Sequence, residues 1–358
     1  MHRYHLARRP HRTPLFCLVA VAAGAVSANA QPTTAPATRE AATATQPHGR
    51  LPGFSVSAHF DEQIKTYTFE PGALIHINAP SAARFDPAKP TTIAIYALPN
   101  GNTTAQTIGR KPGPDVDWHF GIQHIGAQTR CLREVLSDEN LVVAYVEADT
   151  RSWPRWKSLH ENYRTLLPKI VESIRSPFAA GRTSIVLTGH SGGGSFVLGY
   201  IDSVERIGND VKRIAFLDSN YGYSDESGHG DKLIVWLKAA PDHYLNVLAY
   251  DDRDVLFNGK PIVSPTGGTF RATQRMRMRL EKDIPLTETP CDGYTRYHGL
   301  AGRVELIVHA NPDNRILHTA LVGDMSGFIH TMTAGTPAEN KAGRFKGPIP
   351  YTAWIQPD

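Results

Sequence analysis

The residues best suited to chemistry form one short run, Gly189-His190-Ser191-Gly192-Gly193. The run matches the pattern Gly-x-Ser-x-Gly, and the apolar residues Ile185 to Leu187 precede it. At a sharp turn from a buried strand into a helix, the central serine adopts a strained backbone conformation and its hydroxyl projects from the sheet edge. The flanking glycines allow strand and helix to pass closely. We therefore predict that Ser191 is a nucleophile, beside helix N–H groups that can hold an oxyanion.

A serine hydroxyl needs a base to accept its proton, and the base needs an acid that orients it. With a serine at such a turn, the acid and then the histidine follow later in the chain. We predict that His318 is the base, because it follows the last expected core strand and precedes the final helix. His330, inside that helix, and His309, at the tip of that strand, are the alternatives.

Three aspartates at predicted strand ends are candidates for the acid. Asp254 is preferred, because the sequence around it resembles a strand followed by Gly-x-x-Asp, with Asp251 in the position of the glycine. Asp252 is a close alternative, since the missing glycine can offset the loop. Asp218, after the preceding strand, is the third candidate. At least two of the three are expected to be ordinary turn or cap residues.

An oxyanion hole requires two N–H donors close to the nucleophile. The N–H of Gly192, the residue after the serine, is the first candidate. The second is the N–H of Asn102 in the turn Asn100-Gly101-Asn102, which follows an apolar strand. An ordinary Asn-Gly turn is the alternative interpretation of this loop.

The elements that position these residues alternate along the chain. Strands are expected at 91–98, 141–147, 185–187, 213–217, 245–250 and 303–309, and helices at 126–136, 158–175, 231–239, 269–282 and 325–334. Residues 54–77 are expected to add antiparallel strands at one edge. This pattern predicts an α/β fold with a mostly parallel sheet flanked by helices, whose ligands gather at the carboxyl ends of the strands. Residues 255–302, between the last two core strands, are predicted to form an inserted cap.

From about residue 85 to 335, the serine turn and the later acid and histidine resemble the α/β-hydrolase fold family, in particular its serine esterases and lipases. The resemblance implies a Ser–His–Asp triad, an acyl-enzyme intermediate and no cofactor. The chain departs from the commoner family pattern at two places. Asn100-Gly101 stands where many members have His-Gly, and the acid loop lacks its glycine.

Residues 1–30 are predicted to be a cleavable signal peptide, and therefore the protein to be secreted or periplasmic. Four arginines without an acid precede the apolar run Leu15 to Val26, and Ala28-Asn29-Ala30 offers a cleavage site. Without those arginines, the Lys and Arg count falls from 38 to 34 and equals the 34 Asp and Glu. The excess positive charge thus belongs to the leader and gives no indication of nucleic-acid binding. No stable membrane anchor is expected, because the apolar run is too short to span a bilayer.

The remaining chain is divided into a Thr/Ala/Pro-rich disordered linker at 31–50 and an α/β-hydrolase domain at 51–358. Cys131 and Cys291 either pair or remain two thiols, and the sequence does not decide between them. No metal is predicted, because Asp117, His119 and His124 match no zinc spacing. Aromatic residues in predicted loops near the strand ends could form a platform for substrate: Trp118, Trp153, Trp156 and Tyr221.

The sequence therefore predicts an exported serine hydrolase that cleaves carboxylic esters through an acyl-enzyme on Ser191. Its partner would be a small-molecule or acylated substrate, and its oligomeric state is not predicted. A peptidase or amidase with the same triad is one alternative. A catalytically silent binding protein on the same fold is another, from a different functional class.

Overall fold

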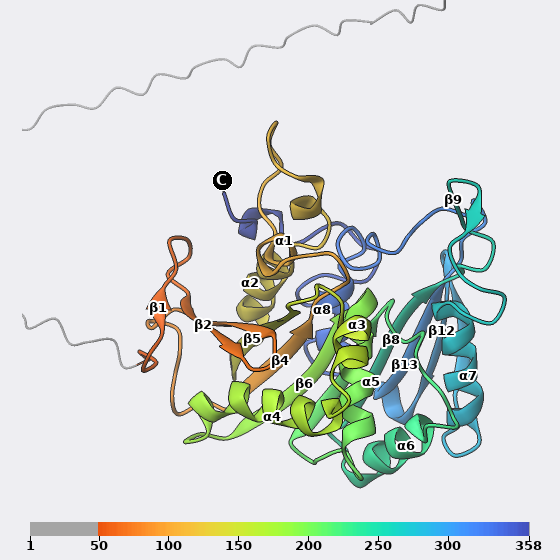
Figure 1. The fold of residues 1–358 in the computed structure, drawn as a ribbon, viewed down its shortest axis with the longest axis horizontal. Coiled ribbons are helices and arrows are strands. Elements are labelled where there is room, and N and C mark those ends of the chain that lie inside the picture. The colour runs from red at the N-terminus through yellow and green to blue at the C-terminus, as the bar shows by residue number, and fades with distance from the viewer. Residues whose placement is uncertain (1–48, 358) are drawn as a thin grey trace, which may run out of the picture. The chain divides into compact units, whose positions relative to one another are not determined.

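A central sheet with helices on both faces forms the body of the protein (Figure 1). The computed structural model describes residues 49–357, so the predicted signal peptide and most of the predicted linker lie outside the described residues. Within that range, eleven strands form the sheet in this order: β1 (Ser55–Val56), β2 (Gln63–Phe69), β3 (Ala73–Ala79), β5 (Asn140–Ala148), β4 (Thr91–Ala97), β6 (Thr183–His190), β7 (Val211–Leu217), β8 (Tyr244–Tyr250), β13 (Val304–His309), β12 (Tyr294–Gly299) and β11 (Thr287–Cys291).

The sheet is mixed, whereas the sequence predicts a mostly parallel one. The middle strands β5, β4, β6, β7, β8 and β13 are parallel, as expected from their alternation with helices. The predicted antiparallel strands at the N-terminal edge are present as β1 to β3. The opposite edge carries a second antiparallel pair, β11 and β12, which the sequence analysis did not predict.

Two sets of helices cover the two faces of the sheet. One face is covered by α3 (Trp153–Leu159), α4 (Tyr163–Arg175), α5 (Gly194–Ser203), α6 (His229–Ala239) and α7 (Thr269–Glu281). The other is covered by α2 (Ile125–Val135) and α8 (Gly327–Thr333), with the short helix α1 (Thr104–Ile108) beside them. Successive side chains of a strand point to opposite faces of the sheet, and both faces are covered by helices. The middle strands are therefore apolar throughout, and their side chains belong to two separate cores.

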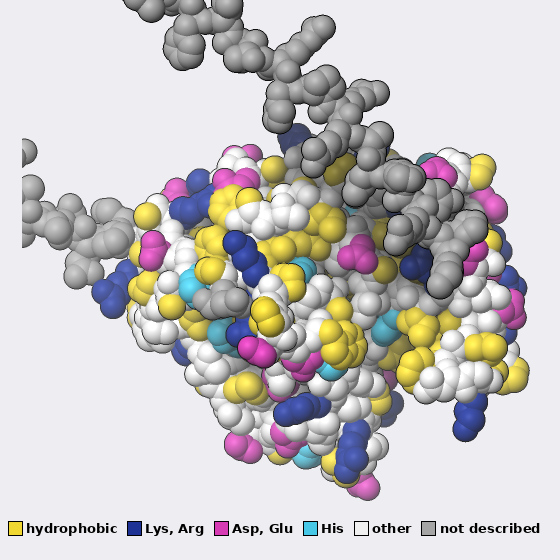
Figure 2. All heavy atoms as spheres, turned by 90° about the horizontal axis from the view of Figure 1, so that it is seen from above, with side chains coloured by type: hydrophobic (Ala, Val, Ile, Leu, Met, Phe, Trp, Pro, Cys, Tyr) yellow, Lys and Arg dark blue, Asp and Glu magenta, His cyan; other side chains and the backbone are white. Residues whose placement is uncertain are grey.

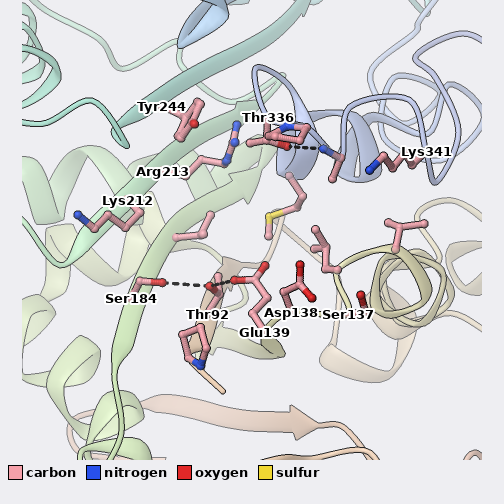
Figure 3. A pocket seen from close by; sticks show the side chains of 17 residues that line it. Thr92, Ser137, Asp138, Glu139, Ser184, Lys212, Arg213, Tyr244, Thr336 and Lys341 are labelled. Atoms are coloured by element: carbon pink, nitrogen blue, oxygen red, sulfur yellow. Dashed lines mark hydrogen bonds between the residues drawn. The ribbon is translucent and has the colours of Figure 1, made fainter. Parts of the chain in front are cut away.

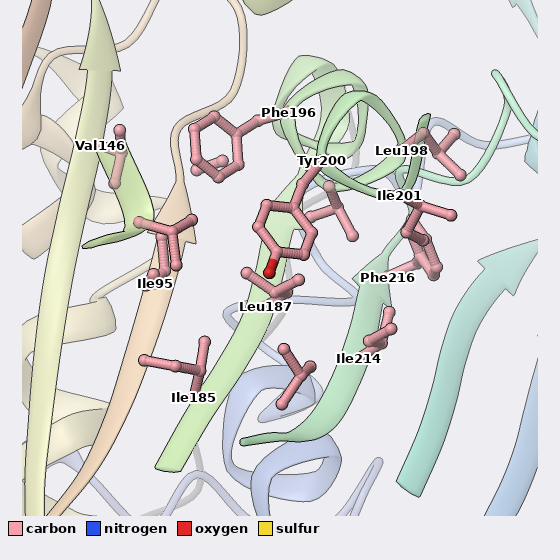
Figure 4. Packing of buried hydrophobic residues seen from close by; sticks show 14 of the residues in the cluster. Ile95, Val146, Ile185, Leu187, Phe196, Leu198, Tyr200, Ile201, Ile214 and Phe216 are labelled. Atoms are coloured by element: carbon pink, nitrogen blue, oxygen red, sulfur yellow. The ribbon is translucent and has the colours of Figure 1, made fainter. Parts of the chain in front are cut away.

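The larger core fixes the helix that follows the serine. Leu187 of β6, Ile95 of β4 and Phe216 of β7 are fully buried beneath Phe196 and Ile201 of α5 (Figure 4). A buried Phe or Ile side chain contributes roughly 1.5–3 kcal/mol relative to an exposed one. The start of α5 is therefore held firmly against the carboxyl ends of β4, β6 and β7.

The sequence predicts an inserted cap at residues 255–302, but in the structure these residues do not form a separate cap. The helix expected at 269–282 is present as α7, but its Met276 and Leu280 are buried in the larger core. Strands β11 and β12 extend the main sheet. The part outside the sheet is a hairpin of β9 (Leu256–Phe257) and β10 (Lys260–Pro261) and the loop that leads to Gly268.

Two further features of the described residues bear on the sequence predictions. Cys131 and Cys291 are both free thiols. Among residues 49–357, no helix has both the length and the apolar character needed to cross a bilayer.

Candidate active site

Ser191 lies at the turn between β6 and α5, where the sequence analysis places it. Strand β6 ends at His190, and residues Ser191–Gly193 form a 3-10 turn before α5 begins at Gly194. Ser191 has a φ of 52°, in the left-handed region that non-glycine residues rarely adopt. This strained conformation is the one expected of a nucleophilic serine at a strand-to-helix turn.

Glycines around Ser191 are required by close packing rather than by their own backbone angles. A methyl group on Gly193 would collide with the carbonyl of Ala97 at the end of β4. One on Gly194 would collide with the carbonyl of Ser219, after β7. The start of α5 thus packs tightly against the ends of β4 and β7, the two strands on either side of β6, and this packing fixes the position of Ser191.

His318 is oriented by Asp218. The two residues lie 100 positions apart in the chain, and His318 Nδ1 is 2.5 Å from Asp218 Oδ2. The Asp218 side chain is 2% exposed and that of His318 is 31% exposed. An Nδ1–H that donates to a carboxylate leaves Nε2 with a free lone pair. His318 is therefore arranged to accept a proton at Nε2, and it lines the same cavity as Ser191.

The structure does not bring Asp254, the preferred acid of the sequence analysis, to His318. Asp254 is exposed to solvent. Asp251, which occupies the expected glycine position, is instead paired with Arg253, whose Nε lies 2.8 Å from Asp251 Oδ1. The resulting turn directs Asp252 inward and Asp254 outward. The carboxylate beside His318 is that of Asp218, the third candidate.

Asp252 is buried at the end of β8 but does not contact His318. Its Oδ2 accepts a hydrogen bond from the N–H of Thr269 at 2.7 Å. Burial raises its pKa, and the charge of Asp218 raises it further. Asp252 therefore caps the N-terminus of α7 while it lines the cavity beside Ser191.

The other candidate histidines lie elsewhere. His330 Nε2 is 2.7 Å from Glu305 Oε2, and both side chains are buried in the body of the protein. His309 Nδ1 is 2.5 Å from its neighbour's carbonyl, Ala310 O. Neither histidine lines the cavity that contains Ser191.

His190, the residue before Ser191, holds the backbone of His318. Its Nε2 lies 3.0 Å from the carbonyl oxygen of His318. Burial lowers the pKa of His190 well below its ordinary value, and the nearby His318 lowers it further. His190 is therefore neutral and donates its Nε2–H to that carbonyl. The sequence analysis assigned His190 no role.

Of the predicted oxyanion loop, Asn100 lies against the serine turn. Gly192 is buried, and a methyl group on it would collide with the Asn100 side chain. The N–H of Gly101 donates to the carbonyl of Arg151 at 2.9 Å and is thus engaged. Asn102 is buried, and its Nδ2 has no hydrogen-bond partner among the described residues.

The cavity beside Ser191 has a volume of about 550 Å³. Besides Ser191, His318 and Asp218, its walls are mostly apolar or aromatic: Tyr221, Tyr250, Ile262, Val263 and Ile316. Leu256 and Phe257 on β9, in the same segment as Ile262 and Val263, are exposed apolar residues. Figure 2 shows hydrophobic side chains exposed at several places on the face of the molecule seen from above.

Tyr221 was one of four aromatic residues that the sequence analysis named near the strand ends. It lines the same cavity as Ser191, and burial raises its pKa to about 12. It is therefore a neutral phenol in that cavity. Trp153 and Trp156 belong to α3, in a segment predicted to be a loop, and are buried in the larger core.

A second cavity, of about 430 Å³, lies at the opposite end of the sheet, where β4, β6, β7 and β8 begin (Figure 3). Its polar groups bond to one another. Thr92 Oγ1 lies 2.5 Å from Glu139 Oε2 and 3.0 Å from Ser184 Oγ. Arg213 donates to the carbonyls of Thr331 and Ala334. No histidine is among the residues that line this cavity.

Metal binding receives no support from the described residues, which contain no group of three His, Cys, Asp or Glu side chains placed to hold an ion. His119 Nδ1 lies 2.6 Å from Asp117 Oδ1, in an exposed loop. His124 is buried and lies apart from the cavity that contains Ser191.

No protein-family model matches the chain, and no curated protein matches it in sequence. Among solved structures, the siderophore hydrolase EstB from Aspergillus nidulans has 14% identity, covers 77% of this chain and 95% of its own, and gives a TM-score of 0.38. A thermostable esterase has 12% identity, with coverage of 76% and 63% and a TM-score of 0.41. An S-formylglutathione hydrolase from Agrobacterium tumefaciens has 9% identity, with coverage of 78% and 98% and a TM-score of 0.36. The solved structures to which the chain is similar thus include esterases and other hydrolases.

Proposed function

We propose that the protein is a serine hydrolase of the α/β-hydrolase type that cleaves carboxylic esters through an acyl-enzyme on Ser191. The observation that carries this proposal is the hydrogen bond from His318 Nδ1 to the buried carboxylate of Asp218, at a cavity that Ser191 also lines. This arrangement leaves a basic nitrogen on His318 beside a strained, partly exposed serine. The acid of the triad is then Asp218 rather than Asp254.

In the proposed reaction, His318 Nε2 removes the proton of Ser191 as Oγ attacks the ester carbonyl carbon. The tetrahedral intermediate collapses when His318 returns the proton to the leaving alkoxide, which departs as an alcohol. Water then attacks the acyl-enzyme with His318 as base, and the acid product leaves Ser191 free. Asp218 stabilises the imidazolium that forms in both steps.

The negative charge on the carbonyl oxygen needs two donors, and we assign the N–H of Gly192 as the first. For the second we retain the N–H of Asn102, because the neighbouring N–H of Gly101 is already bonded to Arg151. The Asn100 side chain packs on Gly192 and closes this side of the site. A single such donor typically contributes 10²- to 10³-fold to turnover, as an order of magnitude.

The substrate is proposed to carry an uncharged, apolar acyl group. Ile262, Val263 and Ile316 give the wall of the cavity its aliphatic side chains, and no lysine or arginine lines it. An aliphatic or aromatic group would bury apolar surface there at roughly 25 cal/mol per Å². A substrate carboxylate would find no positive side chain, only Asp218 and Asp252.

Export is part of the same proposal. The basic, apolar and small-residue segments of residues 1–30 support a leader that directs the protein out of the cytoplasm. A free, small or acylated substrate is then the expected partner, rather than nucleic acid or a membrane anchor. Secretion of a reporter fused to residues 1–50 would test this part separately.

The activity is tested with a fluorophosphonate probe and a panel of p-nitrophenyl esters and anilides. The wild type should be labelled and should cleave esters, while Ser191→Ala should fold and do neither. Cleavage of anilides at comparable rates would favour the amidase alternative. A folded wild-type protein that neither reacts with the probe nor cleaves any ester would support the silent binding protein instead.

A further inference from the structure

Asp218 has a second partner that the triad does not account for. While Oδ2 of Asp218 receives His318 Nδ1, its Oδ1 receives the hydroxyl of Thr269 at 2.5 Å. Both carboxylate oxygens are thus engaged, and Thr269 and Asp218 are both buried. Thr269 is the first residue of α7, which belongs to the inserted segment 255–302 rather than to the common core of strands.

The backbone of Thr269 is itself fixed by Asp252. The N–H of Thr269 donates to Asp252 Oδ2 at 2.7 Å, which ties the start of α7 to the end of β8. Gly268, with a φ of 92°, lets the chain pass directly over this carboxylate, since a Cβ there would lie 2.6 Å from both of its oxygens. The direction of the Thr269 hydroxyl is therefore set by the structure around it.

The Thr269 hydroxyl carries one proton, and two carboxylates lie within reach of it. The distance to Asp218 Oδ1 is 2.5 Å, whereas that to Asp252 Oδ2 is 3.3 Å. The hydroxyl therefore donates to Asp218.

We propose that Thr269 is a positioning residue for the triad, whose hydroxyl holds the Asp218 carboxylate in the orientation that receives His318, with Asp252 as the anchor of Thr269. The proposal rests on the proposed function, since it assigns a role through Asp218. A carboxylate held at one oxygen only could rotate about its Cβ–Cγ bond, and the hydrogen bond to His318 would lose its alignment. Asp252, at the end of β8, thereby supports the triad without being its acid.

A second contact between the same elements provides an internal control. Asn220 Nδ2 donates to Thr273 Oγ1 at 3.0 Å, one turn further along α7. Like Thr269, Thr273 is buried and ties α7 to the loop after β7. Thr273 makes no hydrogen bond to Asp218 in the structure. A variant at Thr273 therefore loosens the same contact between elements without touching the acid.

The experiment compares Thr269→Val, Thr269→Ser and Thr273→Val in the full-length protein, using the best p-nitrophenyl ester. Thr269→Val should lower kcat by about 10- to 100-fold with little change in KM, as expected for loss of a hydrogen bond to a charged group. Thr269→Ser should restore most of the rate. Thr273→Val should stay within about twofold of the wild type in kcat, whatever its effect on melting temperature.

The pH profile supplies a readout that a purely structural role would not move. Without the Thr269 donor, the hydrogen bond between Asp218 and His318 loses its alignment, so the carboxylate stabilises the protonated form of His318 less. The acidic limb of kcat/KM in Thr269→Val should therefore shift to lower pH. The titratable groups that face Asp218 and His318 are Asp252, Tyr221, Tyr250 and His190, and all four are unchanged in this variant.

A wild-type kcat and pH profile in folded Thr269→Val would overturn the proposal. An equal loss of kcat in Thr273→Val would also overturn it, as would a kcat in Thr269→Ser as low as that in Thr269→Val. Fluorophosphonate labelling of the wild type separates this result from failure of the proposed function. A labelled, active wild type with an unaffected Thr269→Val rejects only the role of Thr269. An unlabelled, inactive wild type rejects the hydrolase itself.

Discussion

The imidazole of His190 lies against that of His318, with the ring centroids 4.4 Å apart, and its Nε2 is 3.0 Å from the His318 carbonyl oxygen. The residue before Ser191 thus holds the loop that carries His318. Asp218 fixes the ring of His318 and His190 fixes its backbone. The distance between Ser191 and His318 consequently depends on a contact made next to Ser191 itself.

Replacing His190 with Phe should weaken catalysis without abolishing it. Phenylalanine can keep the ring contact with His318 but cannot donate to its carbonyl. Loss of a neutral hydrogen bond of about 1 kcal/mol predicts roughly a fivefold lower kcat/KM. Steady-state rates on a p-nitrophenyl ester would measure this change. Labelling of Ser191 by a fluorophosphonate should persist, and an unchanged kcat/KM would show that the loop after β13 is held by other contacts.

The stability of the protein should fall in mild acid because of its buried histidines. Burial lowers the pKa of His190 strongly and also lowers those of His124 and His309. Below about pH 6.5, the unfolded chain binds protons at these positions while the folded protein does not. The free energy of unfolding therefore decreases as the pH falls from about 6.5 toward the lowered pKa values, and is unaffected by these groups above that range.

Urea unfolding between pH 7.5 and 5 would measure this slope. His190→Phe removes the group with the largest lowering and should show a shallower dependence on pH than the wild type. The remaining slope belongs to His124, His309 and other titrating groups. An identical slope in the two proteins would mean that His190 takes up its proton equally in both states.

Asp254, which the sequence analysis preferred as the acid, and Asp218, its third candidate, should differ sharply in their effect on kcat. In Asp218→Asn, the amide can donate to His318 Nδ1 and favour the wrong tautomer, so kcat should fall by about 10³- to 10⁴-fold. Asp254→Asn alters an exposed side chain and should change kcat by less than about twofold. Rates and circular dichroism of both variants would test the assignment. Loss of activity in Asp254→Asn alone would return the acid to the loop after β8.

The position of Ser191 could be predicted because local physics determines it. An apolar strand, a Gly-x-Ser-x-Gly turn and an apolar helix occupy consecutive residues, and the structure has them as β6, the turn and α5. The parallel middle of the sheet could be predicted for the same reason. Each of its strands is an apolar run separated from the next by a helical segment.

The partner of His318 could not be predicted, because it depends on which way a turn faces. The loop after β8 contains Asp251, Asp252 and Asp254, and only the pairing of Asp251 with Arg253 shows which of them points inward. Thr269 lies 51 residues from Asp218, and no local pattern connects them. Strand β11 carries Pro290 and has mostly exposed side chains, so it lacks the apolar alternation that marks a strand.

Gly193 should be intolerant of even one added methyl group. In Gly193→Ala, the methyl would collide with the carbonyl of Ala97, a backbone atom of β4 that cannot move without disturbing the sheet. Overpacking of this kind costs about 1–3 kcal/mol, and any relief would displace the start of α5 and Ser191 with it. The variant should therefore unfold at lower urea concentration and also react more slowly with a fluorophosphonate. Gly121→Ala is the matched control, since nothing lies within 4 Å of the added methyl, and it should match the wild type in both measurements. Equal stability and equal labelling of Gly193→Ala would mean that β4 and α5 are not packed as closely as the structure has them.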